Sequence, residues 1–342
     1  ITQKCLNNNN LSAIRFENNE FFNNTYFFSE FIKKNKIENL HLDENPWNVI
    51  NNKISDIKQK IELNHKRLKN WNILFCRGLL TGLNEAFIID GETRKEIIEN
   101  ESDSGKFIKP ILRGRDTRAF YAEFKDLWIL NIPKGYTIKT KSGRNDVVFE
   151  PMPRYGNFED TDAWEWFVDK HPKVSNHLLP FKQRAQKRDD QGDYWWELRA
   201  CSYIGEFEKP KIIFSEIVSE PQFYYDEKCY YPEATVFFIT GERLKYLTAL
   251  LNSKAVTFLF KSFYMGGELV GKIRYKKAFL EQIPIPTPTD LEEKNIIEIV
   301  DKIIDYKSES KSTTALEAEI DQLVYELYGL TEEEIKIVEG KG

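Results

Sequence analysis

The stretch Arg77-Gly-Leu-Leu-Thr-Gly-Leu-Asn-Glu-Ala-Phe87 says most about the fold of this chain. It lies between two apolar runs, Trp71 to Cys76 and Ile88 to Asp90, a pattern that predicts a strand, a polar connection and a second strand. Gly78 and Gly82 can adopt backbone angles closed to other residues, so we expect a tight turn. The polar side chains that project from this turn are Arg77, Thr81, Asn84 and Glu85.

The composition is typical of a folded protein, with 41% hydrophobic and 14% aromatic residues among 342. No apolar run approaches the roughly 18 residues of a membrane-spanning helix, and no signal-peptide pattern is visible. Four cysteines without Cys-x-x-Cys spacing indicate reduced thiols in a cytoplasmic protein. The first residue is Ile rather than Met, so we expect a piece of a longer protein.

Charge is distributed unevenly along the chain. The net charge of −5 combines residues 1–286, which hold 43 Lys and Arg against 39 Asp and Glu, with residues 287–342, which hold 6 against 15. The acidity therefore belongs to the C-terminal segment, and the rest of the chain is mildly basic. This mild excess of positive charge removes the electrostatic objection to a nucleic-acid partner.

The chain divides into four segments. Residues 1–45, rich in Asn and Phe, are expected to form a connector and the end of a preceding domain. Residues 46–70 predict a helical spacer that starts at Asn45-Pro46-Trp47, because their apolar side chains recur at helical spacing. Residues 71–286 predict a mixed α/β domain, which ends at a run of prolines. Residues 287–342 predict a helical hairpin.

Periodicity also predicts the individual elements. Strands are expected at residues 108–112, 127–132, 211–214 and 236–239. Helices are expected at residues 244–260, 291–306 and 314–328. Loops are expected at residues 134–160, 182–199 and 261–277.

Three places carry side chains suited to binding DNA. Arg or Lys can pair with two atoms of guanine, and Asn or Gln with two atoms of adenine, whereas phosphate contacts need only positive charge or hydrogen-bond donors. The candidate DNA-binding residues are Arg77, Thr81 and Asn84 in the opening stretch, Arg113, Arg115 and Arg118 after an apolar strand, and Arg184, Lys187, Arg188, Arg199, Lys272, Arg274, Lys276 and Lys277 in the loops. We expect residues 272–277 to face the same side as the arginines of residues 113–118, making one positive concave surface.

Each of these places also has a purely structural interpretation. In the opening stretch, Glu85 would pair with Arg77 or accept hydrogen bonds from loop amides. In the arginine cluster at residues 113–118, Arg115 and Asp116 would form a surface ion pair. In the loop at residues 182–199, at least one of the two tryptophans would pack into the core.

A family resemblance is carried by the opening stretch together with Ile108-Lys-Pro-Ile-Leu-Arg-Gly-Arg-Asp116 and Phe279-Leu-Glu-Gln-Ile-Pro-Ile-Pro286. In order and spacing, these segments resemble the TaqI-type C-terminal specificity domain, from about Asn45 to the C-terminus. In that family, the domain is the target-recognition part of type IIG restriction–modification enzymes and related adenine methyltransferases.

The resemblance implies an α+β fold, mixed α/β with a helical lead-in and a C-terminal helical hairpin. It implies a chain that binds a specific sequence of double-stranded DNA and catalyses nothing by itself. Methyl transfer from S-adenosylmethionine to adenine N6 would belong to an N-terminal methyltransferase part, with or without a nuclease. Because family members recognise many different sites, the shared opening stretch should position the fold or the DNA. We expect base readers in residues 182–199 or 134–160.

The sequence lacks the motifs by which methyltransferases and metal-dependent nucleases bind their cofactors and substrates. No Gly-x-Gly follows a strand and no Asn/Asp-Pro-Pro-aromatic tetrapeptide occurs, so we expect no binding of S-adenosylmethionine by this chain. No Pro-Asp precedes an Asp/Glu-x-Lys triplet, and His41, His65, His171 and His177 lie too far apart for a helical zinc pair. We therefore expect no catalytic or metal-binding residues, and we expect His171 and His177 at the surface or at helix caps.

Two other functions stay open on the sequence. One is a separate specificity subunit that docks a methyltransferase, as in type I systems. A methyltransferase motif encoded upstream in the same reading frame would exclude it. The other is a stand-alone nuclease with an unfamiliar site, which metal-dependent cleavage of DNA by the isolated chain would establish.

Overall fold

The computed structural model describes residues 52–142, 160–265 and 271–341. The predicted connector at residues 1–45 and the expected start of the spacer helix at Asn45-Pro46-Trp47 lie outside these ranges. Residues 143–159 of one expected loop and Gly266-Gly267 of another lie outside them as well. Within the described ranges, no helix is long and apolar enough to cross a membrane.

The first sheet has four antiparallel strands in the order β10 (Tyr224–Asp226), β8 (Lys211–Ser215), β12 (Val236–Gly241) and β2 (Ile73–Arg77). Both of its faces are covered, because Ile212 and Phe214 pack into one hydrophobic core while Ile213 packs into another. Alternate residues of a strand point to opposite faces, so a strand covered on both sides is a continuous apolar run. The strands predicted at residues 211–214 and 236–239 are confirmed.

The second sheet has the strand order β11 (Tyr231–Pro232), β4 (Ile108–Leu112), β7 (Leu127–Leu130) and β3 (Ile88–Asp90). β11 is parallel to β4, and the other pairs are antiparallel. The strands predicted at residues 108–112 and 127–132 are confirmed, the latter with a slightly earlier end.

The opening stretch joins these two sheets. β2 ends in the first sheet at Arg77, and β3 begins in the second sheet at Ile88. The connection contains a short helix, α3 (Asn84–Phe87), that the sequence did not predict. Gly82 has φ of +68°, the left-handed conformation expected of a tight turn.

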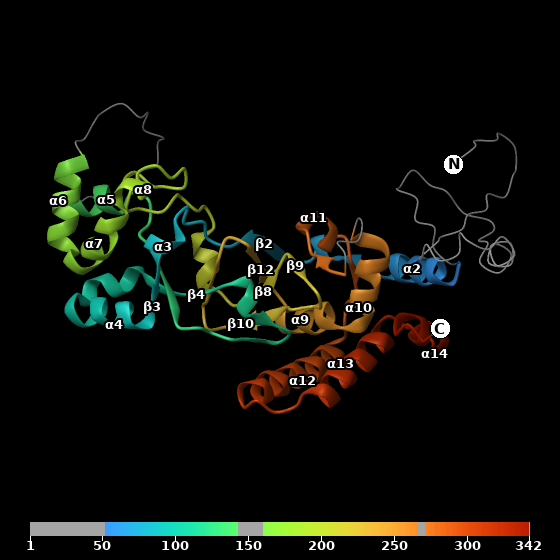
Figure 1. Cartoon of the computed structure of the whole chain (residues 1–342). Helices are drawn as coiled ribbons and strands as arrows, with labels where there is room; N and C mark the ends of the chain where they lie inside the picture. Colours follow the sequence, from blue (N-terminus) through green and yellow to red (C-terminus); the bar gives the residue numbers. More distant parts are fainter. Residues whose placement is uncertain (1–51, 143–159, 266–270, 342) are drawn as a thin grey trace, which may run out of the picture.

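The first core joins the first sheet to the helices α2 (Asn52–Asn64), α9 (Leu244–Asn252), α10 (Lys254–Leu259), α12 (Asp290–Ser308), α13 (Thr314–Leu327) and α14 (Glu332–Val338). Figure 1 shows α12 and α13 side by side, as the predicted helical hairpin requires, with α14 after them. The single helix expected at residues 244–260 is divided at Ser253, because the Ser253 hydroxyl accepts a hydrogen bond from the Val256 amide and caps α10.

The second core joins the second sheet to α4 (Gly91–Asn100), α5 (Tyr136–Ser142), α6 (Asp160–Lys170), α7 (Pro172–Leu178) and α8 (Lys182–Ala185). These helices lie at one end of the elongated molecule in Figure 1. Trp195 and Trp196 are both buried there, as the structural interpretation predicted for at least one. His171 is fully buried, so a surface position was wrong, but it occupies the N-cap position of α7, as the capping alternative predicted. Aromatic rings of Phe107, Tyr136 and Phe167 enclose it.

Short elements complete the fold. β1 (Lys66–Arg67) pairs with β14 (Pro284–Ile285), β5 (Thr117–Arg118) with β6 (Tyr121–Ala122), and β9 (Ile217–Val218) with β13 (Ile273–Arg274), while α11 (Lys277–Leu280) follows β13. The segments expected as loops therefore contain α5, α8 and β13. The fold is α+β with a C-terminal helical hairpin, as predicted.

Candidate nucleic-acid interface

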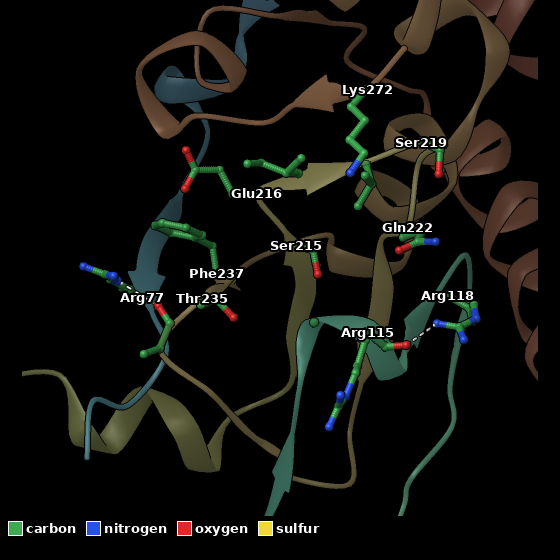
Figure 2. A pocket seen from close by; sticks show the side chains of 14 residues that line it. Arg77, Arg115, Arg118, Ser215, Glu216, Ser219, Gln222, Thr235, Phe237 and Lys272 are labelled. Atoms are coloured by element: carbon green, nitrogen blue, oxygen red, sulfur yellow. Dashed lines mark hydrogen bonds between the residues drawn. The ribbon is translucent and has the colours of Figure 1, made fainter. Parts of the chain in front are cut away.

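A cleft with a volume of about 650 Å³ opens at one edge of the first sheet. The antiparallel pairing places the C-terminal ends of β2 and β8 beside the N-terminal end of β12, so Arg77, Ser215 and Phe237 meet at this edge. Figure 2 shows Arg77 and Phe237 on one side of Ser215, the segment with Arg115 and Arg118 on the other, and Lys272 above them. The cleft is thus assembled from segments that are far apart in the sequence.

Four of the predicted DNA-binding residues line this cleft: Arg77, Arg115, Arg118 and Lys272. Among its described lining residues, the one carboxylate is Glu216. Glu216 Oε1 lies 2.8 Å from Arg274 Nε, which neutralises it. The lining therefore carries a net positive charge, which favours an anionic ligand.

The cations in the cleft differ in how they are held. Arg77 Nε donates a hydrogen bond to the Ala234 carbonyl at 2.8 Å. Arg118 donates to the Arg115 carbonyl at 2.7 Å, and its guanidinium lies 3.3 Å from a carboxylate oxygen of Glu123. The exposed side chain of Arg115 has no hydrogen bond or ion pair to any described residue. Arg115 is therefore the guanidinium most available to a ligand.

The expected ion pair between Arg115 and Asp116 does not form. Asp116 pairs with Arg113 instead, with Nε and Oδ2 2.7 Å apart. Gly114 allows this turn to lie against β8, because a Cβ on Gly114 would stand 2.6 Å from Ser215 Oγ. The turn therefore holds Arg113 inward, against Asp116, and presents Arg115 to solvent.

Only part of the basic segment at residues 272–277 lies at the cleft. Lys272 lines the cleft with Arg115 and Arg118, as predicted. Arg274 is occupied by Glu216. Lys276 and Lys277 are exposed but lie outside the lining; Lys277 Nζ is 6.0 Å from the ring centre of Phe75.

In the opening stretch, the side chains of Thr81 and Asn84 form hydrogen bonds within the protein. Thr81 is 2% exposed, and its hydroxyl donates to the Asn84 side-chain oxygen at 2.6 Å. The Asn84 amide in turn donates to Glu233 Oε1 at 2.7 Å. The expected pairing of Glu85 with Arg77 was wrong, because Glu85 forms an ion pair with Arg184. These contacts give the stretch a structural role, with Arg77 as the member that reaches the cleft.

The predicted residues of the segment at 182–199 lie away from the cleft lining. Arg184 pairs with Glu85, and Arg199 pairs with Asp190 at 2.9 Å. Lys187 is exposed on this segment. The segment therefore adds its charges to another part of the surface.

Arg188 is buried, which excludes the predicted contact of its side chain with DNA in this structure. Its guanidinium donates hydrogen bonds to the backbone carbonyls of Thr81, Asp190, Trp195 and Glu197. Burial lowers the pKa of Arg188 to about 10, so the side chain still carries its charge at neutral pH. These hydrogen bonds connect the opening stretch, through Thr81, to the segment that contains Trp195 and Trp196.

Sequence reasoning missed the uncharged part of the cleft. Gln222, Ser219 and Thr235 add polar groups to the lining, and Phe237 adds an aromatic ring. Neither composition nor local periodicity marks these residues, because each is ordinary in its own segment. Within the described residues, no cluster of three or more His, Cys, Asp or Glu side chains could hold a metal ion.

Comparison with known proteins identifies the family. Residues 109–285 match the family described as the TaqI-like C-terminal specificity domain. The chain is also similar to the Type II methyltransferase M.MjaIV of Methanocaldococcus jannaschii, with 24% identity over 296 residues that cover 83% of this chain and 86% of that protein.

Two solved structures are similar in arrangement. The type IIL restriction–modification enzyme MmeI, in complex with DNA, has 12% identity and a TM-score of 0.48 over 81% of this chain and 36% of its own. The type IIG restriction endonuclease BpuSI has 13% identity and a TM-score of 0.42 over 81% of this chain and 33% of its own. This chain spans about a third of the length of these two enzymes. Because the matched residues 109–285 make up more than half of the 342 residues, the chain belongs to the family of TaqI-like C-terminal specificity domains.

Proposed function

We propose that this chain binds double-stranded DNA in the cationic cleft, as the sequence-recognising part of a type IIG-like restriction–modification enzyme that methylates adenine N6. The observation that carries the proposal is the convergence of Arg77, Arg115, Arg118 and Lys272 at one cleft. Cationic side chains gathered from distant segments suit a ligand with regularly spaced phosphates, and phosphate contacts supply much of the affinity of proteins for DNA.

The site lies mostly within the region that defines the family. Arg115, Arg118 and Lys272 belong to the matched residues 109–285, while Arg77 reaches the same cleft from the opening stretch. A specificity domain needs a surface that holds the DNA backbone and other groups that read bases. The cleft offers both kinds of group, because uncharged polar side chains lie among its cations.

The chemistry of the proposed enzyme belongs to a methyltransferase part. S-Adenosylmethionine would bind in that part, and this chain would present the DNA to it. The name of the relative from Methanocaldococcus jannaschii, a Type II methyltransferase, supports the link with methylation. We expect no cofactor, metal or catalytic residue in this chain, and titration calorimetry with S-adenosylmethionine tests the first of these.

Binding of labelled duplex DNA by the chain, followed by fluorescence anisotropy, tests the main proposal. The double variant R115A/K272A should lose affinity at every salt concentration between roughly 50 and 200 mM and show a weaker salt dependence. The variant K294A/K302A removes the same charge from exposed positions of α12 and should bind as the unmodified chain does. Equal binding by the two variants would contradict the assignment of DNA to the cleft.

A second candidate is a separate specificity chain that docks a methyltransferase. The length of the relative is the observation behind it, since a match over 83% of this chain and 86% of that protein means that a protein of similar length exists separately. Co-expression of the chain with a candidate methyltransferase, followed by size-exclusion chromatography, would show a stable complex in this case.

A further inference from the structure

Gln222 stands out among the uncharged residues of the cleft. It lies on the segment that joins β9 to β10, and Figure 2 shows its amide between Lys272 and Arg118. Its side chain is half-buried and makes no hydrogen bond to any residue in the described part of the chain. A half-buried amide without a protein partner is a group free to bind a ligand.

The backbone that carries Gln222 is held firmly. The next residue, Phe223, donates its amide hydrogen to Asn252 Oδ1 at 3.0 Å and accepts hydrogen bonds from Asn252 Nδ2 at 2.8 Å and from the Phe120 amide at 3.0 Å. The Phe223 ring is fully buried, with the Phe214 ring centre 5.1 Å away. Pro221 fixes the backbone angle on the other side. A free side chain on a fixed backbone is the arrangement that selective binding requires.

The chemistry of this position differs from that of its neighbours. Lys272 and Arg118 offer only donors, which phosphates accept without regard to sequence. Ser215 is buried, and its hydroxyl has no partner among the described residues. The Gln222 amide offers a donor and an acceptor side by side, and this pair matches the N7 and N6 groups of adenine in the major groove.

On the proposed function of the cleft, we infer that Gln222 reads one adenine of the recognised DNA sequence while the surrounding cations hold the backbone. This assigns base reading to the segment between β9 and β10 instead of residues 182–199. In that earlier candidate segment, Arg184 and Arg199 are paired and Arg188 is buried.

Selection of duplexes from a randomised DNA library by the 342-residue chain, followed by sequencing, tests this inference. The unmodified chain should select a motif with adenine at one position. In Gln222→Ala, the preference for adenine at that position should fall by between about 5-fold and 150-fold, with the other positions unchanged. Gln222→Glu should prefer cytosine at the same position, because a carboxylate accepts a hydrogen bond from cytosine N4.

Gln186→Ala is the matched control, since Gln186 is an exposed glutamine in the segment at 182–199, outside the cleft lining. It should leave the selected motif unchanged. A folded Gln222→Ala variant that selects the same motif as the unmodified chain would overturn the inference but leave the cleft as the DNA site. An unmodified chain that retains no DNA would overturn the proposed function, and this inference with it.

Discussion

Gly78 lies so close to Glu233 that a Cβ on Gly78 would stand 2.1 Å from the Glu233 carbonyl oxygen. Backbone hydrogen bonds fix this approach, from the Gly78 amide to the Val236 carbonyl and from the Leu79 amide to the Pro232 carbonyl, both at 2.8 Å. The glycine is thus required for close contact between two backbones, whereas Gly82 is required for its positive φ. This contact joins the opening stretch to the residues that connect β11 to β12.

Gly78→Ala should therefore destabilise the fold. The atoms that the new methyl group would meet are backbone atoms, which cannot move aside as a flexible side chain can, so we expect a loss of about 1–3 kcal/mol in the free energy of unfolding. Gly205→Ala is the control, because no atom lies within 4 Å of its added Cβ. Urea denaturation of the two variants measures the difference, and equal stabilities would show that the backbone can separate at Gly78 without cost.

Arg113 and Arg115 should respond differently to replacement. Arg115→Ala should flatten the slope of log affinity for DNA against log salt by about 0.9, since one phosphate contact is lost. Arg113 is paired with Asp116, so Arg113→Ala should lower stability and leave that slope unchanged. Binding isotherms at several salt concentrations separate the two, and a flattened slope for Arg113→Ala would mean that its pair with Asp116 opens on DNA.

Replacement of Asn84 should affect the fold rather than the sequence recognised. The Asn84 side chain links Thr81 to Glu233, so Asn84→Ala should cost about 1 kcal/mol of stability through the lost hydrogen bonds. The motif that the variant selects from random DNA should be that of the unmodified chain. A changed base preference in this variant would place base reading in the opening stretch.

Replacement of one partner of the ion pair between Lys211 and Asp226 should lower the stability of the fold strongly. Both side chains are fully buried, with Nζ and Oδ2 2.8 Å apart. Lys211→Met would leave a buried carboxylate without its partner, at a cost of about 3–5 kcal/mol, whereas the double variant K211M/D226L should recover much of this loss. For comparison, the exposed pair of Lys95 and Glu99 should contribute less than about 1 kcal/mol. Urea denaturation of these two variants and of Lys95→Met completes the measurement.

Stability should fall in mild acid because of His171. Burial lowers the pKa of His171 below 6.5, although Glu101 beside it acts in the opposite direction. His171 Nδ1 lies 2.8 Å from Glu101 Oε1, and Nε2 lies 2.7 Å from the Tyr136 hydroxyl, so a neutral ring that donates to the carboxylate accepts from the hydroxyl. Below pH 6.5 the unfolded chain binds a proton that the folded chain does not, so the free energy of unfolding decreases as pH falls.

His171→Gln should make this pH dependence shallower between about pH 7 and pH 5, by at most about 1.4 kcal/mol per pH unit. The two proteins are compared by the slope of the unfolding free energy against pH, because the variant also loses hydrogen bonds, and with them stability, at every pH. His177, whose pKa is likewise lowered by burial, keeps part of the dependence in the variant. Parallel stability curves for the two proteins would mean that folding leaves the pKa of His171 unchanged, which would contradict the lowering by burial.

The sequence by itself determined most of the local structure. Runs of β-branched and aromatic residues located β4, β7, β8 and β12, because such side chains favour strands that are buried on one or both faces. Apolar spacing located α12 and α13, since helix formation depends on contacts within a few residues. The segments that resemble a known family also identified the specificity domain, which the matched residues confirm.

Only the tertiary structure decided which of the charged residues meet. Antiparallel pairing of β2, β12 and β8 brings Arg77 to the cleft, the turn at Gly114 packs on Ser215 and brings Arg115, and pairing of β9 with β13 brings Lys272. Local sequence carries no information on such long-range contacts. Burial of Arg188 was equally hidden, since a charged residue enters the interior only where carbonyls from distant segments satisfy its donors. The positive surface could thus be predicted as a set of candidate residues, but long-range packing selected its members.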